Sequence, residues 1–161
     1  MFRLLIALAA TFSLAACAPV TAQSGPPHAQ SEAASQRILF IGNSFTMGAN
    51  SAALRYRPDS VEDLNGEGVG GIPALFAKFA EQAGMEWSVS HETRGGTTLD
   101  FHLNERREMI DRAWDVVVMQ QFSVLDPQKP GDPGGTVRDA PLLANLFTAR
   151  NPDVRVYLMA T

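Results

Sequence analysis

Residues 37–46 read Arg-Ile-Leu-Phe-Ile-Gly-Asn-Ser-Phe-Thr, and this stretch decides the fold class. The apolar run is typical of a buried parallel strand, and the Gly-Asn-Ser that follows is typical of a tight turn. The turn presents the hydroxyl of Ser44. Because α/β proteins place ligands and reactive groups at the carboxyl ends of strands, Ser44 is the first candidate functional residue.

The rest of the chain alternates between helical and strand patterns. Apolar residues recur at helical spacing in residues 71–83, with Pro73 suited to the first turn and Gly84 to the position after the last. Residues 115–119 form a nearly continuous apolar run, which is typical of a strand buried on both faces. The remaining pattern predicts helices at 45–54, at 99–110 and from Pro141 to Asn151, strands at 86–92 and 154–159, and loops at 55–70, 94–98 and 122–137.

This order of elements predicts an α/β fold. Alternating strands and helices build a parallel sheet that is covered by helices, with right-handed crossovers. We expect a three-layer α/β/α sandwich whose central parallel sheet has a flavodoxin-like order, with four strands from these residues. The strand at 154–159 would lack a covering helix, so we expect a longer chain, with the last strand and helix missing here.

The composition excludes several classes of protein. Of the 161 residues, 45% are hydrophobic and 19% are charged, which allows a sizeable core. The formal net charge of −4 gives no reason to expect nucleic-acid binding. The zinc-binding pattern of cysteines and histidines is missing, and we expect no metal and no cofactor. The acidic residues of the 55–70 loop are irregularly spaced and are read as a solvated surface: Asp59, Glu62, Asp63 and Glu67.

The first residues predict export. Residues 1–3 are positively charged, and residues 4–16 are apolar but too short to span a bilayer comfortably. Leu14-Ala15-Ala16-Cys17 resembles a bacterial lipobox in which Cys17 becomes lipidated, with cleavage after Ala22 as the alternative. Cys17 is the only cysteine, so the chain can form no internal disulfide.

Three segments are therefore expected: a signal peptide with a lipobox at 1–17, a flexible linker at 18–36 and the folded domain at 37–161. The expected location is the periplasmic side of the cell envelope, with the lipid anchor at Cys17 as the only link to the membrane. A freely secreted protein is the alternative.

Three predicted turns should meet at one edge of the sheet. Ser44 follows the first strand, Gly95-Gly96 the second, and Gln120-Gln121-Phe122-Ser123 the third. This arrangement suits acyl transfer, with Ser44 as the nucleophile and the N–H groups of Ser44 and Gly95 as oxyanion donors. Gln121 or Ser123 would supply a third donor. The residues expected to help bind the substrate are Asn43, Gly96, Gln120 and His102.

These blocks resemble the SGNH (GDSL-like) hydrolases. Gly42-Asn43-Ser44 is similar to their first block, Gly95 to their second-block glycine, and residues 115–123 to their third block. The resemblance covers three blocks in order across most of residues 37–161. It implies a serine hydrolase that acts on carboxylic esters, with an acetylated carbohydrate as one candidate substrate.

The chain departs from the family pattern twice. The third block usually reads Gly-x-Asn-Asp, whereas residues 120–123 read Gln-Gln-Phe-Ser, which resembles a divergent branch with a Gln-rich third block. The family also takes its catalytic Asp and His from a C-terminal Asp-x-x-His block, which this sequence lacks. The resemblance therefore implies that the base and the residue that orients it lie outside these residues.

The histidines of the chain are poor candidates for that base. His91 falls inside a predicted strand, and His28 falls in the predicted linker. His102 matches the His of a Gly-Gly-x-Ser-Leu-x-x-His pattern in the divergent branch, where the resemblance implies a supporting role.

We expect a serine esterase whose partner is a small-molecule or carbohydrate ester. The first alternative is a non-catalytic envelope lipoprotein of the same fold that binds a sugar or a peptide. A flavin or nucleotide binder is a further alternative, although the chain has no Walker motif. The sequence leaves the oligomeric state open.

Overall fold

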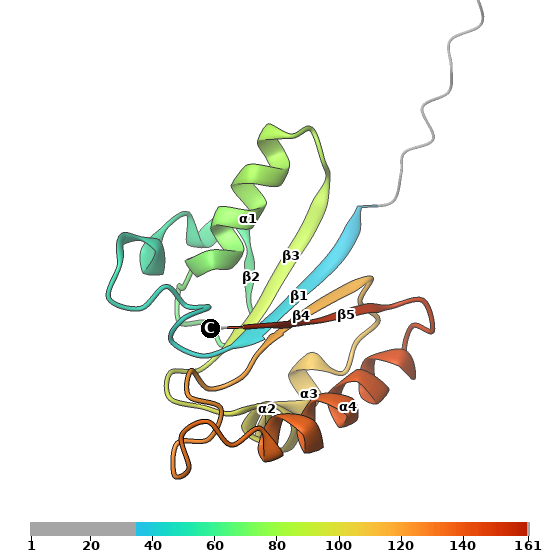
Figure 1. Cartoon of the computed structure of the whole chain (residues 1–161). Coiled ribbons are helices and arrows are strands. Elements are labelled where there is room, and N and C mark those ends of the chain that lie inside the picture. Colours follow the sequence, from blue (N-terminus) through green and yellow to red (C-terminus); the bar gives the residue numbers. More distant parts are fainter. Residues whose placement is uncertain (1–34, 161) are drawn as a thin grey trace, which may run out of the picture. The chain divides into compact units, whose positions relative to one another are not determined.

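The computed structural model describes residues 35–160, which form one α/β unit (Figure 1). Its sheet has five parallel strands in the order β2-β3-β1-β4-β5. Apart from the short edge strand β2, this is the flavodoxin-like order, so the predicted fold class is confirmed. The strands are β1 Gln36–Gly42, β2 Glu62–Asp63, β3 Trp87–Thr93, β4 Val116–Gln120 and β5 Arg155–Met159.

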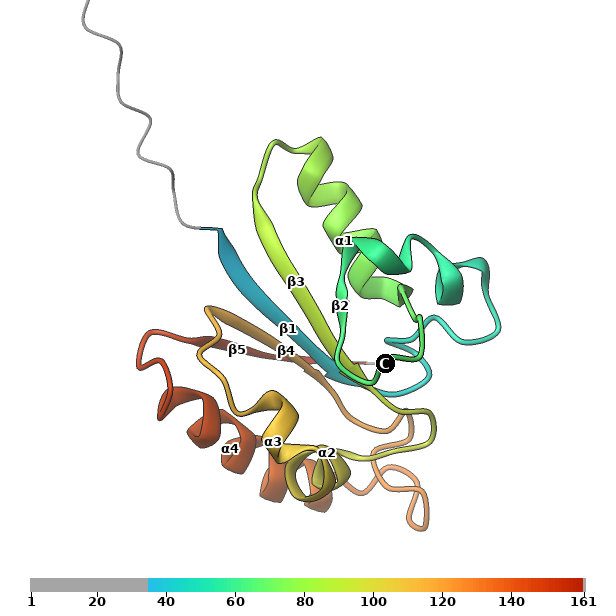
Figure 2. The same cartoon turned by 180° about the vertical axis from the view of Figure 1, so that it is seen from behind.

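Helices lie on both faces of the sheet, as Figures 1 and 2 show from opposite sides. One face carries α1 (Gly71–Gln82). The other face carries α2 (Leu99–Glu105), α3 (Arg107–Ile110) and α4 (Gly134–Thr148). Two short 3-10 helices, η1 (Ala52–Arg55) and η2 (Pro58–Ser60), lie between β1 and α1 in the chain.

Each face of the sheet has its own apolar core, and β1 contributes to both. Leu39 and Ile41 are completely buried in the core beneath α2, α3 and α4. Ile38 and Phe40 pack in the second core, where the Phe40 and Phe76 ring centroids lie 5.5 Å apart. A register shift by one residue would exchange the two sets of side chains. This packing therefore fixes where β1 ends and where Ser44 stands.

The segment between β1 and α1 differs from the prediction. A helix was expected at 45–54, but Gly48 and Asn50 have φ values of +65° and +62°, and such left-handed residues end a helical turn. The chain makes turns until η1. The predicted loop at 55–70 contains η2 and the additional strand β2, so the sheet has five strands rather than four.

Two helix boundaries also differ. The helix expected at 99–110 is divided into α2 and α3 at Arg106. α4 begins at Gly134 rather than at Pro141, which lies inside the helix. A proline in a helix removes the N–H that would bond to the carbonyl four residues earlier, here that of Val137. Val137 is 69% exposed, so this part of α4 faces solvent.

β1 begins at Gln36, one residue before the predicted start of the domain. The predicted signal peptide, the lipidation at Cys17 and nearly all of the predicted linker lie outside the described residues. Within residues 35–160, no helix has both the length and the apolar character that crossing a membrane requires.

Candidate active site

The loops that follow β1, β3 and β4 meet at one edge of the sheet, as predicted. The Asn43 side-chain amide, just after β1, donates to the Thr97 carbonyl at 3.1 Å and to the Gln121 carbonyl at 3.4 Å. The Gln121 side-chain oxygen in turn accepts from the N–H of Leu99 at 3.1 Å. The first loop is thus bonded directly to the other two, and the third loop is bonded to the start of α2, which follows the second loop.

Ser44 stands at the start of the first of these loops and is half-buried. Its carbonyl accepts from the Ala49 N–H at 2.9 Å, and the Asn43 carbonyl accepts from Met47, also at 2.9 Å. No group of residues 35–160 forms a hydrogen bond with the Ser44 hydroxyl or with its N–H. The backbone of the turn is therefore fixed, while one hydroxyl and one N–H remain free to bind a ligand.

Two buried amides, those of Asn43 and Gln120, hold this turn; each residue is 1% exposed. Gln120 Oε1 accepts from the Asn43 N–H at 3.1 Å and from the Thr46 hydroxyl at 2.9 Å. Gln120 Nε2 donates to Asn43 Oδ1 at 2.9 Å and to the Gln121 carbonyl at 2.6 Å. Gln120, at the end of the neighbouring strand β4, thus holds the Ser44 turn in place through hydrogen bonds.

The loop after β3 leaves two glycines at the surface. It is held before them by Arg94, whose N–H donates to the Gly42 carbonyl at 3.0 Å, and after them by the Thr97 carbonyl. Gly95 and Gly96 are exposed, and within residues 35–160 their N–H groups find no acceptor. A Cβ at either position would meet no atom within 4 Å, so a ligand can approach this backbone closely.

The two third-donor candidates occupy different environments. Gln121 is 4% exposed, and its Oε1 accepts from Leu99 and from Phe122. Its Nε2 lies 3.9 Å from the position that a Cβ would take at Gly135, at the start of α4. Ser123 is half-buried and lines a cavity of about 510 Å³ together with Gln121.

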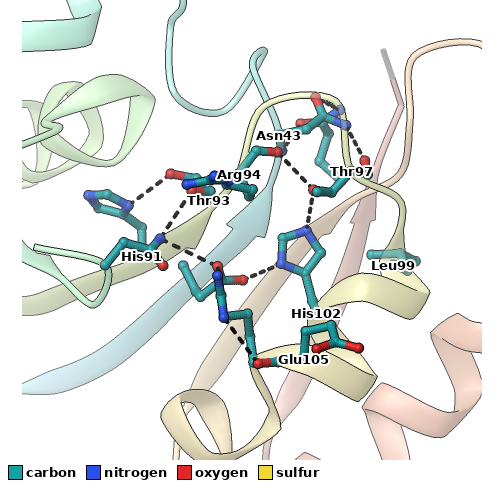
Figure 3. A network of polar contacts seen from close by, with 12 residues as sticks. Asn43, His91, Thr93, Arg94, Thr97, Leu99, His102 and Glu105 are labelled. Atoms are coloured by element: carbon teal, nitrogen blue, oxygen red, sulfur yellow. Dashed lines mark hydrogen bonds and ion pairs between the residues drawn. The ribbon is translucent and has the colours of Figure 1, made fainter. Parts of the chain in front are cut away.

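The two histidines of the described region are completely buried and engaged elsewhere (Figure 3). His91 contacts the Val69 carbonyl through Nε2 at 2.8 Å and the Thr93 hydroxyl through Nδ1 at 3.2 Å. His102 contacts the Glu92 carboxyl through Nδ1 and the Thr97 hydroxyl through Nε2, the latter at 3.1 Å. With both ring nitrogens occupied, neither histidine is free to take a proton from Ser44.

The predicted site residues therefore fall into two groups. Ser44, Gly95, Gly96 and Ser123 are accessible at the edge of the sheet. The side chains of Asn43, Gln120 and His102 are buried and bonded internally. We therefore do not propose that they contact the substrate.

Sequence reasoning missed Thr46, Thr97 and Glu92, which complete the polar network around the turn. The only signal for Glu92 was a carboxylate in an otherwise strand-like segment. Among residues 35–160, no three His, Cys, Asp or Glu side chains gather as a metal site would require.

Comparison with solved structures finds chains of similar fold. A chain described as "a putative SGNH hydrolase from Slackia heliotrinireducens" is similar over 77% of this chain and 55% of its own, with 22% sequence identity and a TM-score of 0.46. This chain thus spans about half the length of that one. No family model and no curated protein matches the sequence.

Proposed function

We propose that this protein is a serine esterase in which Ser44 attacks the carbonyl carbon of a carboxylic ester. The observation that carries the proposal is a half-buried serine at the carboxyl end of a central strand, next to a loop with two glycines. Within residues 35–160, neither the serine hydroxyl nor the two glycine N–H groups form a hydrogen bond. The three sequence blocks that resemble SGNH hydrolases support the same chemistry.

In this reaction the Ser44 oxygen adds to the carbonyl carbon, and the carbonyl oxygen becomes an oxyanion. The N–H groups of Ser44 and Gly95 donate to it, with Gln121 or Ser123 as the third donor. Removing one such donor in other enzymes costs roughly 3–4 kcal/mol of transition-state stabilisation. Collapse of this intermediate expels the alcohol and leaves an acyl group on Ser44, which water then releases.

The proton of the Ser44 hydroxyl needs an acceptor, and His91 and His102 are both engaged elsewhere. We propose that the acceptor is the histidine of an Asp-x-x-His block in a longer form of the protein. Small acyl esters, including acetylated carbohydrates, are the proposed substrates.

The test compares wild type with Ser44→Ala and Ser88→Ala on a short-chain nitrophenyl ester, all in the full-length protein. Ser88 is an exposed serine at the opposite end of β3 and controls for the same chemical change. We expect Ser44→Ala to lower kcat at least about 100-fold and Ser88→Ala to leave it unchanged. Equal rates for all three proteins would refute the nucleophile.

A second candidate is a binding protein of the same fold that captures a sugar or a peptide at this edge of the sheet. It is favoured because His91 and His102 are both bonded within the fold and neither can serve as the base. This candidate predicts no Ser44-dependent hydrolysis. It predicts instead a saturable affinity for acetylated sugars, measured by calorimetry, that Gly95→Ala weakens.

A further inference from the structure

We propose that Glu92, His102 and Thr97 act as positioning residues that hold the Gly95–Gly96 loop in place beside Ser44. The inference rests on the proposed function, because it concerns the backbone donors of that reaction. The three side chains connect β3, α2 and the loop between them. Figure 3 shows the ring of His102 directed toward Thr97.

The contacts form a continuous path. Glu92 on β3 and His102 on α2 are both completely buried, and Glu92 Oε2 contacts His102 Nδ1. On the other side of the ring, His102 Nε2 lies 3.1 Å from the Thr97 hydroxyl. The carbonyl of Thr97 accepts from the Asn43 side chain at 3.1 Å, next to Ser44. The path thus begins in the core and ends at Asn43, the residue before the proposed nucleophile.

The hydrogen-bond count assigns a proton to His102 Nε2. The Thr97 hydroxyl has one proton and donates it to the Arg94 carbonyl at 2.8 Å, so it must accept from the histidine. Nδ1 then either donates to the Glu92 carboxylate or accepts from the protonated acid. The pair has no net charge in either arrangement, and Thr97 receives the same bond.

The loop depends on this bond because it has few others. Between Arg94 and Thr97, the amides of Gly95 and Gly96 have no acceptor in residues 35–160. The Thr97 side chain ties both ends of this span together, since its hydroxyl bonds Arg94 on one side and His102 on the other. Without the Thr97 hydroxyl, we expect the N–H groups of Gly95 and Gly96 to sample several orientations.

Burying Glu92 and His102 costs free energy because both side chains lose their contacts with water. Neighbouring polar groups reduce this cost. Glu92 Oε1 accepts from the Asn65 amide at 3.3 Å and lies 3.8 Å from Arg106 Nε. Buried charged groups are costly even when paired, and apolar side chains often replace them without loss of stability. His102 donates to Thr97 in the loop beside Ser44, and this role explains why the pair is polar rather than apolar.

The first arm of the test measures kinetics in the full-length protein with Thr97→Val, Thr97→Ser and Thr148→Val. The Val variant is similar in size to Thr but lacks the hydroxyl, the Ser variant keeps the hydroxyl, and Thr148 is an exposed residue at the end of α4. We expect Thr97→Val to lower kcat about 10-fold or more with KM unchanged, because oxyanion donors act in the transition state. We expect Thr97→Ser to restore most of the rate and Thr148→Val to match wild type.

The second arm needs no activity. Backbone ¹⁵N relaxation should give rigid amides at Gly95 and Gly96 in wild type and in Thr97→Ser, with order parameters of about 0.85. Thr97→Val should lower them toward about 0.6. Side-chain ¹⁵N spectra of the wild type should show His102 with a proton on Nε2, which tests the path even if Thr97→Val does not fold.

The two arms separate the possible failures. If wild type shows no Ser44-dependent hydrolysis, the proposed function fails, and the order parameters alone decide whether these residues hold the loop. A Thr97→Val protein with wild-type kcat and wild-type order parameters overturns the positioning role. An unprotonated His102 Nε2 in the wild type overturns it as well.

Discussion

Gly95 and Gly96 are adjacent in the chain but differ in what a side chain would do to them. Gly96 has a φ of +78°, a conformation that L-residues rarely adopt, whereas Gly95 lies outside that region. Neither Cβ would meet another atom within 4 Å. Only Gly96 therefore requires glycine for the fold, and a glycine at 95 calls for a functional explanation.

Gly95→Ala should accordingly change activity without changing stability. We expect the free energy of unfolding to stay within about 0.5 kcal/mol of wild type. We expect kcat to fall because the new methyl group stands where the ester must approach. Gly96→Ala should instead cost about 1–2 kcal/mol of stability. Urea unfolding and steady-state kinetics measure the two quantities, and an unchanged kcat in Gly95→Ala would argue against its N–H as a donor.

At this scale the sequence predicted the accessible residues better than the buried ones. Ser44 and Gly95 follow from a general rule about the ends of parallel strands. The inward orientation of Gln120 and the engagement of His102 by Glu92 depend on contacts between distant segments. No local pattern encodes such contacts. The substrate-binding role predicted for Gln120 and His102 came from their place near the strand ends and from motif resemblance, neither of which tells which way a side chain points.

Among the elements, β4 supports the Ser44 turn through a single side chain. The Gln120 amide accepts from Asn43 and Thr46 and donates back to Asn43. Gln120→Leu should leave these buried groups without partners and lower the free energy of unfolding by about 2–4 kcal/mol, since each unsatisfied buried group costs about 1–3 kcal/mol.

Chemical denaturation of Gln120→Leu tests this, with Gln128→Leu as control because Gln128 lies in the exposed loop before α4. A decrease in the free energy of unfolding below about 0.5 kcal/mol would mean that the turn is stable without the Gln120 side chain.

The elements themselves were predicted unevenly, for physical reasons. α1 was predicted closely because its apolar spacing, its early proline and the glycine after its end all agree. α4 was predicted to start seven residues late, since a proline is a common start signal but is tolerated inside this helix. β2 has only two residues and pairs through β3, so its own sequence carries no strand pattern.

For the whole molecule, acid should weaken the fold through its paired carboxylates. The Ser90 hydroxyl and then Arg112 lower the pKa of Glu62 below its ordinary value of 4.5. Arg150 likewise lowers the pKa of Asp111 below 3.8. A group with a lowered folded pKa stabilises the protein above its ordinary pKa, and this stabilisation is lost as the pH falls through the folded value.

Glu62→Gln should thus be less stable than wild type at about pH 6, and the difference should shrink toward about pH 3. We expect the difference at the higher pH to be below about 1 kcal/mol, because this side chain is half-exposed and screened by solvent. Urea unfolding across this range measures it. A difference that does not change with pH would show that the carboxylate is not the stabilising form.

The architecture as a whole was the most predictable level. The parallel sheet follows from the alternation of elements, and each core follows from the period of two along β1. The flavodoxin-like strand order came with the family resemblance, and the edge strand β2 was not predicted. The polar network at the sheet edge was not predictable in the same way, because it joins β1, β3, β4 and α2 through side chains that are far apart in sequence.

The most direct measurement is covalent labelling of the full-length protein with a fluorophosphonate, followed by mass spectrometry of its peptides. Such a reagent reacts rapidly with a serine oxygen that is activated for attack and far more slowly with ordinary hydroxyl groups. Our account predicts one phosphonate on the peptide that carries Ser44, and none in Ser44→Ala. A wild-type protein that stays unmodified, or that is modified at another serine such as Ser123, would contradict it.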